Sequence, residues 1–155
     1  MKRVLFATII VLTGLFPACD DDMVYDHFET LPEGTWKWTD PREFKLQVED
    51  TLSNHRIYVQ LRHGTDYPYR NLYMFVHVKG PDGQNICDTV NIELAAADGR
   101  WIGKGSGKHR ELRLLYRRQT RFAQAGPYVF TLEQGMRKPA LPVTDIGIRI
   151  ERENP

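Results

Sequence analysis

The sequence predicts an all-β domain, an antiparallel β-sandwich of the immunoglobulin-like or jelly-roll-like type, with seven or eight strands and little helix. The first observation is a set of seven short runs in which apolar and polar residues alternate, the pattern of half-buried strands. The second is that glycine, proline and aspartate residues separate these runs, as in all-β folds. The third is the length of 155 residues, with 41% hydrophobic and 26% charged residues, which fits one globular domain and excludes disordered and coiled-coil chains.

Each alternating run gives a strand one face for the core and one face for solvent. In chain order, the predicted strands cover residues 44–48, 57–61, 73–78, 90–94, 112–117, 128–133 and 146–151. The turns between them fall at residues 32–34, 40–41, 80–83, 98–99, 126–127 and 139–142. Helix is limited to single turns at 94–98 and 118–123. In this register, Val59 points into the core.

The run at 73–78 differs from the others because it is apolar on both faces. Met74 and Val76 share one face, and Tyr73 and Phe75 lie on the other. We expect a central strand that is covered on both sides. The alternative is that the two aromatic rings form an exposed platform for a ligand.

The N-terminus has the layout of a secretory signal peptide. Lys2 and Arg3 precede an apolar run at 4–16, and the small residue Ala18 precedes Cys19. The run is shorter than the roughly 20 residues of a transmembrane helix, although a membrane anchor or a buried core helix is the alternative. The predicted organisation is a signal peptide at 1–18, a lipidated N-terminal tether at 19–24 and a single β-sandwich domain at 25–155.

Cys19 is the predicted lipid attachment site. Residues 15–19, Leu-Phe-Pro-Ala-Cys, resemble a bacterial lipobox, in which the cysteine thiol receives diacylglycerol. The other cysteine is Cys87, which we then expect to pack as a small apolar side chain; a Cys19–Cys87 disulfide is the alternative. Three aspartates at 20–22 follow, and they form either a solvated tether or a signal for sorting to the cell surface.

The segment 100–121 concentrates positive charge. It holds eight basic side chains and one acid, whereas the chain without its first 18 residues has 19 basic and 20 acidic side chains, a formal net charge of −1. Arg113 and Arg117 are expected on the solvent face of one strand, because apolar residues alternate with them. The predicted partner-docking residues are Arg110, Arg113, Arg117, Arg118 and Arg121. This surface suits an acidic partner or a phosphorylated glycolipid. The alternative is a solvent-exposed strand face whose basic side chains pair with acids of a neighbouring strand.

Motifs for catalysis, metals and cofactors are missing from the sequence. The glycine-rich stretch 103–108 lacks the G-x-x-x-x-G-K-[ST] spacing of a phosphate loop and is predicted to be a hairpin connection. Neither Ser53 nor Ser106 lies in a nucleophile motif, and the five histidines lack metal-ligand spacing. Because the net charge is near zero, a dedicated nucleic-acid binder is also excluded. We therefore expect no enzyme, no cofactor, no metal site and no nucleic-acid partner.

Six segments occur in an order and spacing typical of one family. They cover residues 67–76, 88–95, 98–103, 126–130, 135–137 and 145–151. Together with the lipobox at Cys19, they resemble the gliding-motility lipoprotein GldH family. The resemblance implies a lipid-anchored envelope protein of the outer membrane, needed for movement over surfaces and linked to the type IX secretion machinery. It implies no catalytic residue, and its implied partners are other envelope lipoproteins or the motility and secretion machinery.

Three functions compete at this point. The leading one is a non-enzymatic interaction module that supports an envelope assembly. The second is a glycan- or ligand-binding sandwich, for which Trp36, Trp38 and Trp101 are the candidate stacking residues. A cluster of these rings on one open surface would favour it. The third, a hydrolase, has no acid–base pair or metal constellation to support it.

Overall fold

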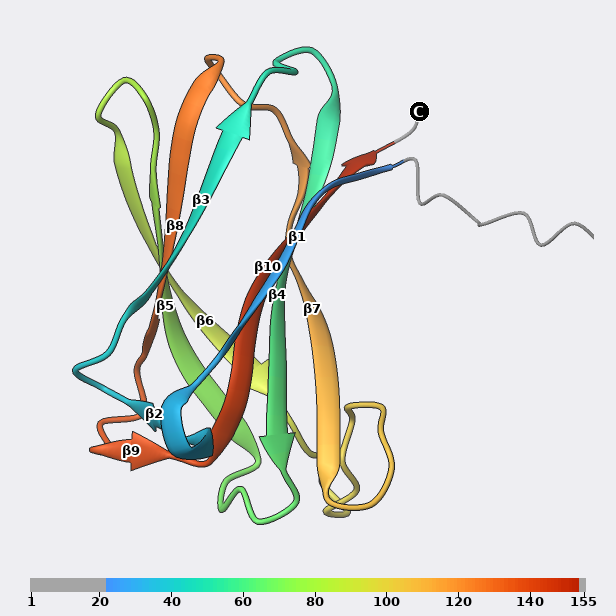
Figure 1. The fold of residues 1–155 in the computed structure, drawn as a ribbon. Helices are drawn as coiled ribbons and strands as arrows, with labels where there is room; N and C mark the ends of the chain where they lie inside the picture. Colours follow the sequence, from blue (N-terminus) through green and yellow to red (C-terminus); the bar gives the residue numbers. More distant parts are fainter. Residues whose placement is uncertain (1–21, 154–155) are drawn as a thin grey trace, which may run out of the picture.

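The computed structural model describes residues 22–153, and nearly all of their regular structure is β-strand (Figure 1). Two four-stranded antiparallel sheets face each other, and a two-stranded ribbon lies at one end. The strands are β1 (Met23–Thr30), β2 (Trp36–Lys37), β3 (Arg42–Val48), β4 (Asn54–Gly64), β5 (Asn71–Lys79), β6 (Asn85–Glu93), β7 (His109–Thr120), β8 (Gly126–Gln134), β9 (Ala140–Leu141) and β10 (Val143–Glu153). A 3-10 turn, η1 (Pro32–Gly34), is the helical element of the described chain. The predicted all-β sandwich is confirmed, with a strand at each of the seven predicted runs.

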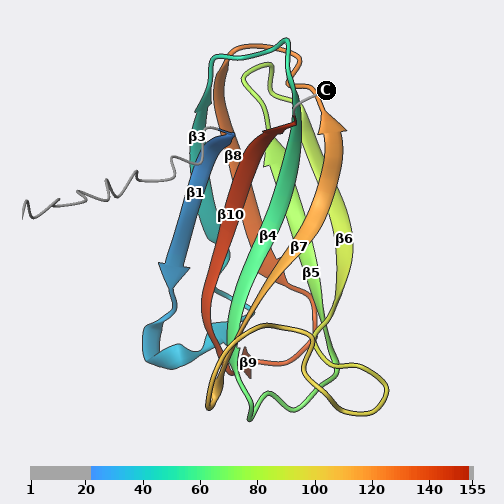
Figure 2. The same ribbon diagram turned by 90° about the vertical axis from the view of Figure 1, so that its right-hand side faces the viewer.

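The eight long strands are connected as a jelly roll. β5 pairs with β6, β4 with β7, β3 with β8 and β1 with β10, so four antiparallel pairs are nested in the sequence. Rolling up this nested hairpin gives one sheet with the order β1-β10-β4-β7, here named sheet 1, and another with the order β3-β8-β5-β6, named sheet 2 (Figure 2). Nested pairing of this kind defines a jelly roll, which selects that prediction over the immunoglobulin-like one.

The core lies between the inner faces of the two sheets and follows the predicted alternation. Val59 is 1% exposed, so its predicted register is confirmed. Side chains without solvent exposure come from both sheets and include Ile146, Ile148 and Ile150 on β10 and Leu72, Met74 and Val76 on β5. Burial of each such side chain contributes about 1.5–3 kcal/mol, and this core fixes which residues face outward.

The outer face of β5 is more open than predicted. Tyr73 is 44% exposed and Phe75 is partly exposed, because no described element covers the outer face of sheet 2 here (Figure 1). The nearest support is Met136, whose sulfur accepts a hydrogen bond from the Tyr73 amide at 3.2 Å. The strand at 73–78 is confirmed, but the expectation that both its faces are covered is wrong.

Three local features also differ from the prediction. Residues 94–98 form a turn next to an isolated β-bridge, and 118–123 begin as the end of β7, so neither is a helical turn. Strand β1 lies outside the predicted runs. Its inward positions include His27, which meets the ring of Phe44 on β3, and Glu29. Polar residues at inward positions remove the alternation by which strands are recognised.

Candidate functional site

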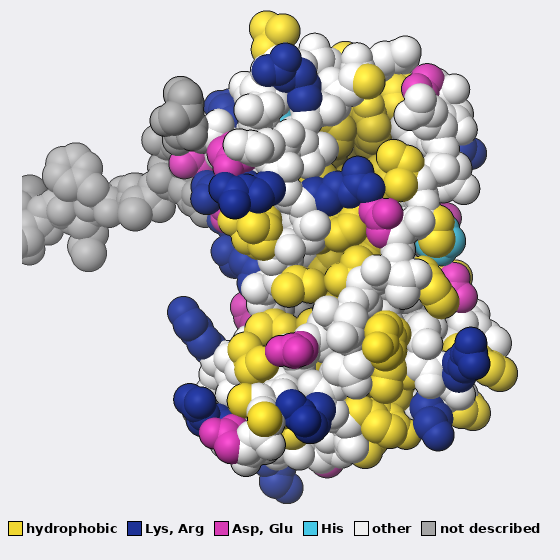
Figure 3. All heavy atoms as spheres, turned by 180° about the vertical axis from the view of Figure 1, so that it is seen from behind, with side chains coloured by type: hydrophobic (Ala, Val, Ile, Leu, Met, Phe, Trp, Pro, Cys, Tyr) yellow, Lys and Arg dark blue, Asp and Glu magenta, His cyan; other side chains and the backbone are white. Residues whose placement is uncertain are grey.

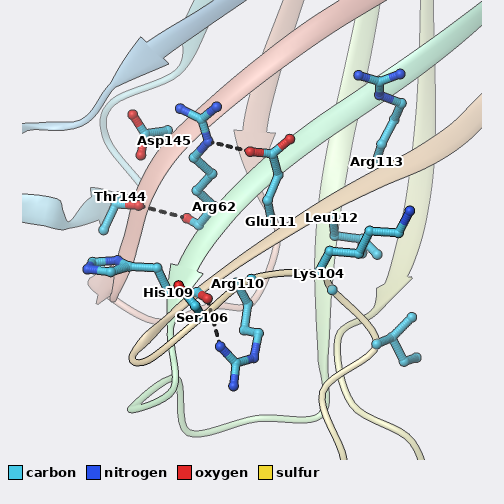
Figure 4. Close-up of a pocket in the computed structure, with 13 residues that line it drawn as sticks. Arg62, Lys104, Ser106, His109, Arg110, Glu111, Leu112, Arg113, Thr144 and Asp145 are labelled. Carbon is cyan, nitrogen blue, oxygen red and sulfur yellow. Dashed lines mark hydrogen bonds and ion pairs between the residues drawn. The ribbon is translucent and has the colours of Figure 1, made fainter.

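A pocket of about 890 Å³ lies on the outer face of sheet 1, beside β7 (Figure 4). The sheet provides Arg62 from β4, Asp145 from β10, and Glu111 and Arg113 from β7. The loop before β7 provides Lys104 and folds back to form the opposite rim. Seen from the side of β6 and β7, the molecule has a hollowed outline where sheet 1 lies (Figure 3). The jelly-roll connectivity therefore gathers residues from three strands and one loop at this point.

Backbone pairing holds this loop against β7. Lys104 and Glu111 exchange two backbone hydrogen bonds, of 2.8 and 2.7 Å. Glycine is needed on both sides of Lys104, since a Cβ would lie 2.8 Å from the Glu111 carbonyl oxygen at Gly103 and 2.2 Å from the His109 carbonyl oxygen at Gly105. The glycine run thus permits a close backbone approach that shapes the rim of the pocket.

Cations exceed carboxylates among the residues that line the pocket. Four arginine or lysine side chains and two carboxylates are present. Glu111 accepts a hydrogen bond from Nε of Arg62 at 2.8 Å, and Asp145 accepts one from the Thr30 hydroxyl at 2.7 Å. Both carboxylates therefore already have partners. The part of the chain that the structure describes places no Phe, Tyr or Trp in the pocket lining, so the walls suit a charged ligand better than a stacked sugar ring.

Arg113 is the exposed end of a row of ion pairs across sheet 1. Its Nη1 lies 3.6 Å from Oε1 of Glu151, and its guanidinium carbon lies 5.9 Å from the ring centroid of Tyr58. Glu151 also accepts a hydrogen bond from Arg149 at 2.6 Å, and Arg149 donates to Asp26 at 2.5 Å. The side chains of Arg149 and Glu151 are 8% and 13% exposed, whereas that of Arg113 is 41% exposed. The buried part of the row is structural, and Arg113 can meet a ligand.

A β-bulge turns Arg117 away from the face that carries Arg113. The register of β4 and β7 shifts at Tyr116, which has no partner on β4. Arg117 donates a hydrogen bond of 2.5 Å to Oδ2 of Asp88 on β6, and the Tyr116 hydroxyl donates to the same oxygen. These hydrogen bonds, from Tyr116 and then Arg117, hold the pKa of the Asp88 carboxyl below its usual range. The expectation that Arg113 and Arg117 share a solvent face is wrong, because Arg117 links the two sheets.

The other predicted docking residues lie in separate places. Arg110 bends back along its own loop and donates to the carbonyl oxygens of Gly107 at 3.0 Å and His109 at 2.7 Å (Figure 4). Arg118 and Arg121 are exposed near the opposite end of β7, and Arg121 borders a different hollow of about 500 Å³. The pocket therefore collects two of the five predicted arginines.

Arg62 and Asp145 were not among the predicted site residues. They lie directly opposite each other in the pairing of β4 with β10, although 83 positions separate them in the chain. Their outward position follows from the alternation, but their proximity to the basic segment depends on the strand order. The strand order is a tertiary property that single-sequence periodicity does not contain.

Of the two cysteines, Cys87 lies among the residues that the structure describes. Cys19, the predicted lipid site, lies outside the described residues. Cys87 is exposed on the outer face of sheet 2, so the expectation that it packs as an apolar side chain is wrong. Its sulfur lies 3.9 Å from Nε2 of His77, which is 3.6 Å from a carboxylate oxygen of Glu133. The outward side of an open sheet face gives this thiol no apolar packing.

The three tryptophans do not share a surface. Trp36 is fully buried, whereas Trp38 is 52% exposed. Trp101 is partly buried against the ring of His63, with centroids 4.8 Å apart. Burial also lowers the pKa of His63 below its usual range. The open cluster of rings that would have favoured a glycan site is not formed by these residues.

Between residues 22 and 153 there is no helix with the length and apolar character needed to cross a membrane. The same residues contain no group of three or more histidine, cysteine, aspartate or glutamate side chains arranged to hold a metal ion.

The fold and the pocket define a small jelly-roll module that carries a charged recess on one sheet. The chain belongs to the GldH lipoprotein family, whose family model matches residues 23–150. It is 31% identical over 148 residues to the gliding motility lipoprotein GldH homolog of Christiangramia forsetii, covering 90% of each chain. It is 28% identical over 161 residues to the gliding motility lipoprotein GldH of Flavobacterium johnsoniae, covering 98% of this chain and 99% of that one.

A solved structure from infectious bursal disease virus, Gt strain, also matches. Its TM-score is 0.19 and its sequence identity 11%, and the chain spans 42% of the viral chain. At that level the likeness carries no argument about this fold or its function.

Proposed function

We propose that this protein is a lipid-anchored part of the gliding-motility apparatus, held in the outer membrane through Cys19 and acting by non-enzymatic protein contacts. Membership of the GldH lipoprotein family supports this, as does the printed name of its relatives, gliding motility lipoprotein. The lipobox-like sequence of residues 15–19 supports Cys19 as the residue that carries the lipid. The partners in this proposal are other envelope lipoproteins or the motility and type IX secretion machinery.

The charged pocket is the observation that favours docking of a protein. Lys104 and Arg113 present cations at its rim, while both lining carboxylates are held by Arg62 and Thr30. An acidic segment of a partner would meet the exposed cation of Lys104 there, together with Arg113, whose exposed guanidinium lies 3.6 Å from one acid, Glu151. Arg110 lines the same pocket, whereas Arg118 and Arg121 lie near the opposite end of β7, outside it. Arg117 is held by Asp88 on β6 and does not line the pocket.

Charge reversal at the pocket tests this docking role. We expect Lys104→Glu with Arg113→Glu to reduce co-purification of motility and secretion proteins from envelope membranes, most strongly at low salt, where charges are least screened. The melting temperature should change little, because both substituted side chains are exposed, exposed pairs contribute about 0–1 kcal/mol, and Glu151 keeps its hydrogen bond from Arg149. The matched control is Lys45→Glu with Arg100→Glu, two side chains that are 75% and 80% exposed and lie outside the pocket. The proposal would be contradicted if the two double variants lost partners equally, or if both kept all of them.

Metabolic labelling tests the anchor separately. We expect radiolabelled palmitate to enter the wild-type chain and to be absent from Cys19→Ser, because the thiol is the alkylated group. Cys87→Ser is the control, since Cys87 is exposed and free and should not affect labelling. Equal labelling of wild type and Cys19→Ser would overturn the lipid site without affecting the docking result.

A further inference from the structure

The four edge strands of the sandwich are protected to very different degrees. Unpaired edges invite pairing with other chains, and proteins block them with bulges, charges or covering loops. β7 has a bulge at Tyr116, a loop residue bridged to Glu111, and Gln119 at a φ of 51°. β1 has a register shift near Met23, and the short strand β3 carries Lys45. Each of these three edges has an identifiable block.

β6 carries two carboxylates, Asp88 and Glu93, but it has no bulge and no basic residue. Its nine residues pair with β5 without any register shift. It contains no lysine, arginine, proline or glycine, and its first three residues are all exposed. Ile86 is 39% exposed at this edge, and apolar side chains are visible between the two sheets when the molecule is viewed from this side (Figure 3).

The backbone groups that point to the free edge of β6 can be identified. The amide of Gly80 donates to Gln84 at 3.0 Å, and the amide of Leu94 donates to Arg70 at 2.8 Å. In both pairs the two residues lie opposite each other in the β5–β6 register and have even numbers. The backbone groups of even-numbered β6 residues therefore bond to β5, and the backbone groups of odd-numbered residues point to the free edge. The odd residues are Asn85, Cys87, Thr89, Asn91 and Glu93, and all five are exposed.

We propose that β6 pairs antiparallel with β6 of a second copy of this chain, about a two-fold axis at Thr89. Thr89 is the midpoint of the strand, so this register pairs all nine residues. It places Asn85 opposite Glu93, Cys87 opposite Asn91 and Ile86 opposite Ile92. No two like charges stand directly opposite, which is the condition for a favourable cross-strand pairing. The result is a continuous sheet of eight strands shared by two copies.

Charge and apolar surface favour a second copy as the occupant. Asp88 is the acid nearest the axis, and it already accepts hydrogen bonds from Tyr116 and Arg117 of its own copy. In this register it lies opposite Val90, so two Asp88 side chains do not face each other. The exposed Ile86 gains an apolar neighbour across the new pair. Symmetric pairing thus uses the same surface on both copies, as a two-fold interface requires.

Cysteine crosslinking tests the register directly. In the proposed pair, Cys87 and residue 91 of the other copy are a hydrogen-bonded pair with Cα atoms about 5.5 Å apart, within disulfide range. We expect Asn91→Cys in the full-length chain to give a disulfide-linked dimer on non-reducing gels of oxidised envelope membranes. The wild type should form the same pair but run as a monomer on these gels, because its two Cys87 residues are four positions out of register, about 14 Å apart along the strand, and cannot form a disulfide. Asn85→Cys is the control, since it faces Glu93.

A proline scan separates edge pairing from folding. Thr89→Pro removes an amide that points to the free edge, whereas Val90→Pro removes one that bonds to β5. We expect Thr89→Pro in the Asn91→Cys background to abolish the crosslink with little change in melting temperature, and Val90→Pro to lower that temperature markedly. Failure of Asn91→Cys to crosslink, equal crosslinking by Asn85→Cys, or a crosslink that survives Thr89→Pro would each overturn the proposal. None of these outcomes depends on the pocket of sheet 1.

Discussion

The ion pairs on the outer faces of the two sheets differ in how deeply they are buried. On sheet 1, Asp26, Arg149 and Glu151 form a row whose arginine is 8% exposed, and the pocket opens beside it. On sheet 2, Lys45 and Glu43 lie 3.7 Å apart but are 75% and 57% exposed. A basic or acidic residue therefore has a structural or an interactive role according to its burial and its partners, and charge density along the sequence does not separate these roles.

The largest expected effect contrasts the inner and outer positions of the strands. Val59→Asp on β4 places an unpaired carboxylate at a site that is 1% exposed, and we expect a loss of about 4 kcal/mol or failure to fold. Lys45→Asp puts the same carboxylate on an exposed outer position and should change stability by less than about 0.5 kcal/mol. Urea unfolding measures both. Similar losses for the two variants would show that the register is wrong.

Removing the buried cation of sheet 1 is next in size. Arg149→Met keeps the volume of the side chain but leaves Asp26 and Glu151 without the guanidinium between them. We expect a loss of about 3 kcal/mol. Lys45→Met on sheet 2 should cost less than about 1 kcal/mol. Equal, small losses in chemical denaturation would mean that the row on sheet 1 is as loosely held as the pair on sheet 2.

A smaller effect is expected where the two sheets are joined. Asp88→Ala removes the acceptor shared by Tyr116 and Arg117, and we expect a loss of about 1–2 kcal/mol. The pKa of Asp88 is lowered in the folded state. The wild type should therefore keep this stabilisation above about pH 4 and lose it as the pH falls through the folded pKa. Thermal melts of wild type and Asp88→Ala should converge at low pH, and a constant gap between them would refute this.

These contrasts show what the sequence alone could and could not predict. The alternation around Val59 identified the strands because apolar periodicity is a local property. The bulge at Tyr116 was not visible, since it depends on how β7 meets β4, and it decides where Arg117 points. The pocket was missed for the same reason: Arg62 and Asp145 become neighbours only through the nested pairing of strands.

The smallest expected effect concerns His63, which is 1% exposed on the inner side of sheet 1. Burial lowers its pKa, so the unfolded chain, with a histidine pKa of about 6.5, binds the proton more readily. Stability should be full above about pH 6.5 and fall as the pH drops through the folded pKa. Asp66 and Arg110 are the charges that act on it. His63→Phe, which preserves an aromatic ring beside Trp101, should flatten the stability profile between pH 7 and 5; an unchanged slope would assign that dependence to other groups.

Site-specific photo-crosslinking in cells tests the docking role of the sheet 1 pocket most directly. A photoreactive residue at Ile102, which lines the pocket and is 46% exposed, is compared with one at Leu52, which is 82% exposed and lies outside it. The account predicts discrete adducts with envelope proteins from position 102, reduced by Lys104→Glu with Arg113→Glu, and none from position 52. Adducts from both positions alike, or from position 52 alone, would contradict it.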